Sequence, residues 1–213
     1  AQMNSINTSV RALAYIGVAV EDPQAWLRFG CDVLGFMPAA KQDGEDRLRI
    51  DERSWRIAVE KGATNDLAFT GYEVTGEEAL EAMFRKLLAL GIKVTEGSDE
   101  LAKDRGVFRL IQCNDPNGLS IEISCGNSER TEYPFVSPCG VNGFVTGEQG
   151  LGHVVLGCDD PKAMRRFYVD ALGFKLSGYL NSMLYLFIMG DPPSGVITSY
   201  PLMPIISVPK IVN

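Results

Sequence analysis

The chain has 213 residues, of which 46% are hydrophobic and 22% charged, and its formal net charge is −7. This balance is typical of a soluble protein with a buried core, and no run reaches the roughly 18 apolar residues of a membrane helix. The acidic charge and the lack of a Lys/Arg cluster argue against nucleic acid as a partner. Because the N-terminus also lacks the apolar core of a signal peptide, we expect a cytoplasmic protein of one or two domains.

Cysteine and histidine usage narrows the possible chemistry. The cysteines are Cys31, Cys113, Cys125, Cys139 and Cys158. Their number is odd and no pair has C-x-x-C spacing, so we expect reduced thiols and neither a disulfide framework nor a zinc knuckle. Since His153 is the single histidine, any catalytic or metal arrangement that needs histidine can use only this residue.

The first predicted elements are a strand and a helix that recur later in the chain. Residues 13–36 (LAYIGVAVEDPQAWLRFGCDVLGF) align with residues 151–174 (LGHVVLGCDDPKAMRRFYVDALGF), and ten of the 24 positions are identical. In each copy an apolar run precedes Asp-Pro, which suits a helix N-terminus, and the helix stops at a glycine. Apolar residues at helical spacing predict one buried face in each helix. These residues are Ala25, Phe29 and Val33 with Trp26 and Leu34 in the first copy, and Ala163, Phe167 and Ala171 with Met164, Tyr168 and Leu172 in the second.

A weaker copy of the pattern lies between these two. Residues 67–74 (LAFTGYEV) resemble the first strand, and the following Thr75-Gly-Glu-Glu78 has the spacing of a capping box. An apolar helical pattern then continues to Gly91. The chain therefore contains three strand-helix openings.

Short strand candidates separated by turn residues follow each opening, so each unit is predicted to be a βαβββ module. Modules one and two occupy about residues 10–125, and module three occupies about 150–200. We predict an N-terminal domain of two modules at 1–130, a Gly-, Pro- and Ser-rich linker at 131–149, and the first half of a second domain at 150–213.

These repeats resemble the vicinal oxygen chelate superfamily, and the run GFVTGEQGLGHVVL resembles the interdomain passage of type I extradiol ring-cleavage dioxygenases. The resemblance covers about residues 8–213. It implies an α+β fold of repeated βαβββ modules that form curved mixed sheets, as in glyoxalases and extradiol dioxygenases, with the second domain incomplete. It also implies cleavage of an aromatic catechol, such as a 2,3-dihydroxybiphenyl-like compound, by O2 beside its two hydroxyls.

Members of this family bind Fe(II), or occasionally Mn(II), through two histidines and one glutamate, which leaves coordination positions open for substrate. The resemblance makes His153 the first metal ligand. Because side chains alternate along a strand, Val155 shares the face of His153, and we expect it to contact substrate. The N-terminal domain of the family holds no metal, consistent with Tyr15 and Phe69 at the positions that match His153. Glu122 is the one carboxylate there on a comparable strand and cannot hold a metal alone.

The other two ligands of the family are expected beyond Asn213, the second histidine being the next residue in our alignment. Phe187 is expected to line an aromatic substrate pocket. Where the family usually has Pro-Arg-His-His, this chain has Asp191-Pro-Pro-Ser-Gly195. We therefore assign no residue to proton transfer.

Three hypotheses follow from these observations. The favoured one is an Fe(II) extradiol dioxygenase of which this chain is an incomplete copy. The second is a catalytically inactive paralogue that binds aromatic ligands or a partner. The third is an open half-module that exchanges strands between chains, which would pair an otherwise free sheet edge and which favours a homo-oligomer.

Overall fold

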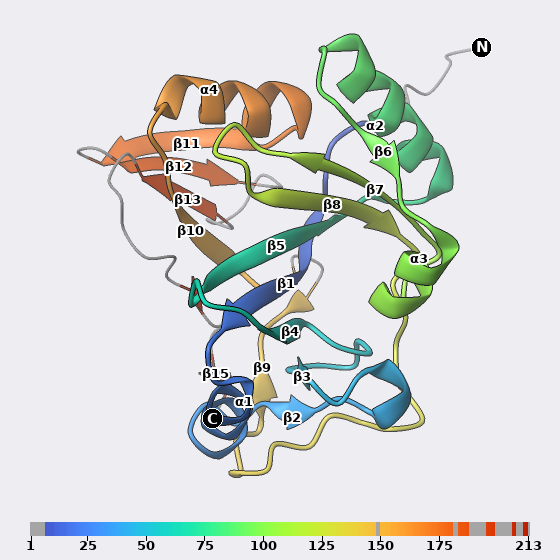
Figure 1. Ribbon diagram of the computed structural model, residues 1–213, viewed down its shortest axis with the longest axis vertical. Coiled ribbons are helices and arrows are strands. Elements are labelled where there is room, and N and C mark those ends of the chain that lie inside the picture. The colour runs from blue at the N-terminus through green and yellow to red at the C-terminus, as the bar shows by residue number, and fades with distance from the viewer. Residues whose placement is uncertain are drawn as a thin grey trace.

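The computed structural model describes residues 7–147, 150–180, 183–187, 195–198, 206–207 and 211–212. Within these ranges modules one and two share an eight-stranded mixed sheet, and module three lies in a five-stranded sheet beside it (Figure 1). In these same ranges we find no helix that is long and apolar enough to span a membrane. The predicted α+β architecture of repeated modules is confirmed.

The modules contain the following elements. Module one comprises β1 (Ala12–Val20), α1 (Pro23–Asp32), β2 (Met37–Pro38), a 3-10 turn (Lys41–Asp43), β3 (Arg47–Arg49) and β4 (Ile57–Lys61). Module two comprises β5 (Asp66–Glu73), α2 (Glu77–Ala89), β6 (Thr95–Glu96), α3 (Asp99–Arg105), β7 (Arg109–Asn114) and β8 (Ser120–Cys125). Module three comprises β10 (His153–Gly157), α4 (Pro161–Arg165), a π-helix (Arg166–Ala171), β11 (Lys175–Leu180), β12 (Met183–Phe187) and β13 (Gly195–Thr198). The remaining strands are β9 (Gly143–Phe144), β14 (Ile206–Ser207) and β15 (Ile211–Val212).

All three modules have the same strand order. The sheet orders are β2-β3-β4-β1 in module one, β6-β7-β8-β5 in module two and β11-β12-β13-β10 in module three. In each module the first strand runs parallel to the last and the intermediate pairs are antiparallel. The β1–β5 antiparallel pair joins modules one and two into one sheet. The repeat seen in the sequence is therefore a repeat of topology.

Helix ends follow the predicted chemistry with one exception. The carboxylates of Asp22 and Asp160 accept hydrogen bonds from the backbone N–H groups of Ala25 and Ala163, each 3.0 Å or less. The predicted capping box before α2 is wrong, because Gly76 is the N-cap residue and no side chain caps the helix. The helix α3, which the sequence analysis did not predict, is capped by Ser98.

The apolar helix faces differ between modules one and three. Phe167, Tyr168 and Ala171 are buried as predicted, and the Tyr168 ring meets Tyr72 of module two edge to face. In α1 the prediction is wrong for Phe29 and Val33, which are 49% and 62% exposed, whereas Trp26 and Leu34 are half-buried against the core. α1 contacts β2, β3 and β4 of its own module through its other side.

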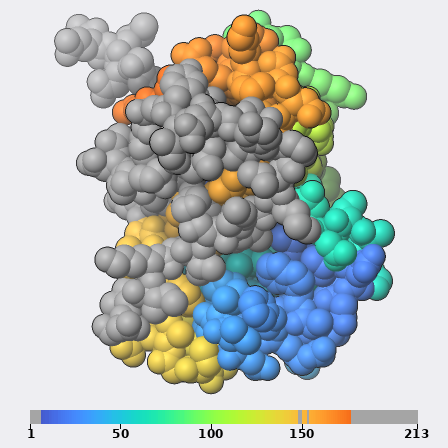
Figure 2. Space-filling model, turned by 90° about the vertical axis from the view of Figure 1, so that its left-hand side faces the viewer, coloured from blue at the N-terminus to red at the C-terminus, as the bar shows by residue number. Residues whose placement is uncertain are grey.

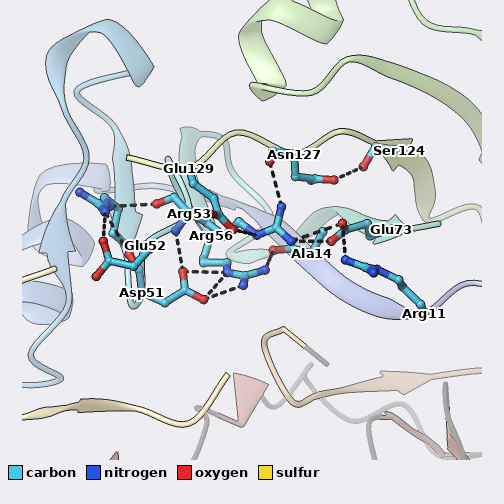
Figure 3. Close-up of polar contacts among 11 residues, drawn as sticks. Arg11, Ala14, Asp51, Glu52, Arg53, Arg56, Glu73, Ser124, Asn127 and Glu129 are labelled. Atoms are coloured by element: carbon cyan, nitrogen blue, oxygen red, sulfur yellow. Dashed lines mark hydrogen bonds and ion pairs between the residues drawn. The ribbon is translucent and has the colours of Figure 1, made fainter. Parts of the chain in front are cut away.

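Arginine side chains fasten module one to the chain that follows β8. Figure 3 shows Arg53 between the carboxylate of Glu73 and the carbonyl of Asn127, to which its guanidinium donates at 3.0 Å each. Arg11 donates to the same Glu73 carboxylate at 3.0 Å. The fully buried Arg49 donates to the Tyr133 carbonyl at 2.6 Å. These contacts fix the start of the segment that leads to module three.

Module three packs on modules one and two through main chain and aromatic rings. Leu151 donates its N–H to the carbonyl of Leu13 at 3.0 Å. The rings of Tyr72, Tyr168 and Phe174 meet edge to face, with centroids 5.3 to 6.4 Å apart. Figure 2 shows the start of module three in orange at one end of this face and module one in blue at the other.

Candidate metal centre

His153 is the first residue of β10, which lies between β13 and β14. It pairs with Ser207 of β14, and Val155 pairs with Val196 of β13. Val196 in turn pairs with Tyr185 of β12. The predicted ligand therefore stands on an inner strand of the five-stranded sheet.

The register also places Phe187, the last residue of β12, relative to His153. Val155, Val196 and Tyr185 form one row across three strands. Because residues two apart on a strand belong to the same face, positions 153 and 187 belong to the face of positions 155 and 185. The sequence analysis singled out Phe187 but missed Tyr185, although the alternation in LYLF signals it.

Modules one and two contain a counterpart of this position in which every side chain is described. Tyr15 of β1 stands where module three has His153, opposite Gly71 of β5, which is itself opposite Glu122 of β8. The Tyr15 hydroxyl donates to Glu122 Oε2 at 2.8 Å. Tyr15 and Glu122 are almost fully buried. Strand pairing thus brings together residues that are 107 positions apart in the sequence.

Arg105, the last residue of α3, completes this counterpart site. Its Nε and Nη2 atoms donate to the two oxygens of Glu122 at 2.9 and 3.0 Å, a bidentate geometry that is strong for arginine and carboxylate. Its guanidinium carbon lies 4.2 Å from the ring centroid of Phe69, within cation–π range. The sequence analysis missed Arg105, although a capping serine at 98 and a glycine at 106 bound the short helix that carries it.

Burial and charge set the protonation states of the site. Burial raises the pKa of Tyr15 well above its ordinary value, and the neighbouring charge of Glu122 adds to the shift. Burial alone would lower the pKa of Arg105, but its hydrogen bonds and charge interaction with Glu122 outweigh that effect and raise it. Tyr15 is therefore a neutral donor and Arg105 a permanent cation at neutral pH.

Two glycines make room for the aromatic rings of this site. A Cβ atom on Gly17 would lie 2.1 Å from the Phe69 ring, and one on Gly71 would lie 2.1 Å from the Tyr15 ring. Real Cβ contacts do not occur at such distances. Module three has Val155 at the position of Gly17, so a side-chain ring could not lie directly against the backbone there as the Phe69 ring does.

A metal ion does not fit the counterpart site. Both oxygens of Glu122 already accept from Arg105, and Tyr15 and Phe69 replace histidine ligands. An adjoining cavity bordered by Tyr15, Trp55 and Arg105 has a volume of about 10 Å³, room for about one water. Across the described residues no group of three His, Cys, Asp or Glu side chains could hold a metal. His153 alone does not complete an iron site either, because Fe(II) of this type needs three protein ligands.

Two family models match separate parts of the chain. The model described as dihydroxybiphenyl dioxygenase BphC D1 matches residues 13–62, which correspond to module one. The model described as glyoxalase/bleomycin resistance protein/dioxygenase superfamily matches residues 150–205, which include module three.

Curated relatives extend this similarity over most of the chain. A biphenyl-2,3-diol 1,2-dioxygenase from Paraburkholderia xenovorans is 49% identical over 173 residues, which cover 81% of this chain and 58% of that protein. A 3-methylcatechol 2,3-dioxygenase from Pseudomonas putida is 43% identical over 81% of this chain and 60% of its own. The chain thus spans less than two thirds of the length of these relatives.

Solved structures share the fold. BphC, a halotolerant catechol dioxygenase, superimposes with a TM-score of 0.83 at 31% identity, over 90% of this chain and 65% of the other. A catechol 2,3-dioxygenase superimposes with a TM-score of 0.81 at 29% identity, over 91% and 72% of the two chains. On this combined evidence, the chain is similar in both sequence and fold to extradiol dioxygenases of the glyoxalase/dioxygenase superfamily.

Proposed function

We propose that the protein containing these residues cleaves the ring of an aromatic catechol with Fe(II) and O2, breaking the bond beside the two hydroxyl-bearing carbons. The observation that carries this proposal is the single histidine at the start of β10, in a chain 49% identical to a biphenyl-2,3-diol 1,2-dioxygenase. The same strand position in module one holds Tyr15, in a site that a salt bridge fills. Among the three first strands, only that of module three has histidine at this position, where modules one and two have Tyr15 and Phe69.

His153 is proposed as one ligand of an iron ion, with Mn(II) as the alternative metal. A relative from Rhodococcus jostii, 38% identical over 79% of this chain, is named an iron-dependent extradiol dioxygenase. Since this chain has one histidine, a second histidine ligand of the family is not among these 213 residues. A bound Fe(II) would supply a Lewis-acidic centre with open positions for two substrate oxygens and O2.

Val155 and Phe187 are proposed to contact the catechol ring, and Tyr185 is added to them by the sheet register. All three positions belong to the face of the sheet that includes position 153. Apolar and aromatic residues at these positions would hold a planar ring and exclude water from it. Relatives act on biphenyl-2,3-diol and on 3-methylcatechol, so we propose a substrate of this class.

The domain arrangement proposed is an N-terminal, metal-free domain at 1–130, a linker at 131–149, and the first half of a catalytic-type domain at 150–213. The separate matches at 13–62 and 150–205 support this division.

A cytoplasmic homo-oligomer is also proposed. Five free thiols support a reducing compartment, and the exposed Phe29 and Val33 on α1 support association.

The decisive experiment measures mass, metal and turnover on one sample. The protein is purified anaerobically from its full coding sequence, its intact mass is determined, and its iron is quantified. We expect about one Fe per chain. We also expect consumption of one O2 per 2,3-dihydroxybiphenyl, with formation of a coloured ring-opened dienoate.

His153→Ala is the test variant and Asn114→Ala the matched control, because Asn114 lies outside module three. The expected result is loss of iron and turnover in the first variant only, with unchanged circular dichroism in both. Iron content and turnover that survive His153→Ala would show that the assignment is wrong. A light-scattering measurement on the same sample tests the oligomer, which a clean monomer would exclude.

A further inference from the structure

One short turn of module two contacts both the helix and the first strand of module three. The turn is Asp115–Gly118, which connects β7 to β8 and lies beside module three in Figure 1. Tyr168 of the π-helix donates its hydroxyl to Asp115 Oδ2 at 3.2 Å. Asn117 Nδ2 donates to the carbonyl of Gly157, the last residue of β10, at 2.8 Å.

The turn is rigid enough to act as a positioning element. Asp115 Oδ1 accepts from the N–H groups of Asn117 and Leu119 at 2.9 Å each. The main chain of the turn is closed by the Gly118 N–H, which donates to the Asp115 carbonyl at 2.9 Å. The Asn117 amide therefore reaches module three from a fixed backbone.

The other end of β10 is held by module one. Gly150 forms a parallel bridge with Leu13, and its φ of 74° allows an approach in which a Cβ would lie 2.1 Å from the Leu13 carbonyl oxygen. The next carbonyl of β1, that of Ala14, accepts from Arg56 Nη1 at 2.7 Å, as Figure 3 shows. Asp51 holds the same guanidinium.

The strand that carries His153 is therefore attached to modules one and two at both ends. Leu151 N–H bonds to β1 two residues before His153, and Gly157 accepts from Asn117 four residues after it. The first attachment uses main chain, whereas the second depends on one side chain. A substitution can remove the second without altering β10 itself.

We propose that Asn117 is a positioning residue: it fixes the C-terminal end of β10 and thereby the backbone of His153. This inference rests on the proposed function in one respect, since it gives Asn117 a role in the reaction only if His153 binds the metal. It also assigns a task to the metal-free modules, which hold the ligand-bearing strand in place.

The single histidine makes the test direct, because a protein labelled only in histidine gives one set of imidazole NMR signals without assignment. Asn117→Asp keeps the size of the side chain and removes the N–H donor. Asn114→Ala is the matched control, since its amide bonds only within the turn, to Gly118. We expect the imidazole signals to shift or broaden in Asn117→Asp and to match the unmodified protein in Asn114→Ala.

Hydrogen exchange gives the second readout. Loss of one hydrogen bond should accelerate exchange of the amides at 154–157 by roughly 2- to 10-fold in Asn117→Asp and Asn117→Ala, and not in Asn114→Ala. Imidazole signals that do not move, or exchange rates equal to those of the control, would overturn the proposal. Neither readout needs metal. If His153→Ala retains iron, the proposed function is wrong, but the effect of Asn117 on the position of β10 can still be measured.

Discussion

β1 and β10 are the equivalent first strands of modules one and three, yet they carry different residues at one matching position. In β1 the position holds Tyr15, whose hydroxyl donates to a buried carboxylate that Arg105 neutralises. In β10 it holds His153, with Val155 where β1 has a glycine. The comparison shows that equivalent strands of the same fold can carry different side chains at this position, and that in modules one and two the neighbouring side chains fill the site.

The main difference lies in the positive charge of Arg105, which neutralises the buried Glu122 carboxylate. A buried carboxylate is costly unless a positive charge accompanies it. In the N-terminal modules a guanidinium supplies that charge from within the chain. The Glu122 carboxylate is therefore satisfied without a metal, and Phe69 and Tyr15 exclude water around it.

Removal of Arg105 should produce the largest effect of any single change in this comparison. Arg105→Met leaves Glu122 buried and unpaired, which should lower the free energy of unfolding by about 3–5 kcal/mol. Urea denaturation followed by tryptophan fluorescence measures the loss. The double variant Arg105→Met with Glu122→Gln should recover most of it, because the amide still accepts from Tyr15 and carries no charge.

The control for this prediction is Arg85→Met, which removes an exposed ion pair with Glu81 at 3.9 Å. Its expected effect is about 0.5 kcal/mol or less. Equal losses in Arg85→Met and Arg105→Met would contradict the view that the buried pair is critical for this site.

An intermediate loss of unfolding free energy is expected when Gly17 of β1 is replaced by valine, the residue that β10 has at the equivalent position 155. Gly17→Val places side-chain atoms in the Phe69 ring and should cost about 1–3 kcal/mol of unfolding free energy. In a Phe69→Ala background the same change should cost less, with a coupling of about 0.5–3 kcal/mol. A loss that is the same in both backgrounds would show that the ring is not what keeps position 17 empty.

The smallest effect concerns pH and the turn that contacts module three. Burial raises the pKa of Asp115 above its ordinary value, against the hydrogen bonds that the turn donates. The folded state therefore holds this proton more tightly than the unfolded chain, and the contribution of Asp115 to stability falls as pH rises through its folded pKa. Asp115→Asn should gain stability relative to the unmodified protein between pH 4 and pH 8 in denaturation series. A difference that moves the other way would contradict the assignment.

The repeat, its βαβββ character and most helix ends could be predicted because they depend on local chemistry. Asp22 and Asp160 cap their helices with their own side chains, so the Asp-Pro pairs were sufficient evidence. The exposure of Phe29 could not be predicted, because it depends on which surface meets the helix and not on the helix pattern. The same residue type at Phe167 is buried, in a core cluster that includes residues of all three modules.

The counterpart site could be predicted only in part for a similar reason. Glu122 was recognised as an isolated carboxylate, but the partner that neutralises it comes from a seven-residue helix too short to show apolar periodicity. His153 and Phe187 were placed on their strands correctly, whereas their membership of one sheet face required the pairing of β12, β13 and β10.

The two glycines beneath the aromatic rings have a consequence for how this domain can evolve. The Tyr15 ring fits only while position 71 is glycine, and the Phe69 ring only while position 17 is glycine. Any path that restores histidines at positions 15 and 69 would also have to remove the guanidinium of Arg105 from Glu122, since each single step leaves a void or an unpaired charge. Each single step of such a path is therefore expected to lower the free energy of unfolding, which favours retention of the metal-free form.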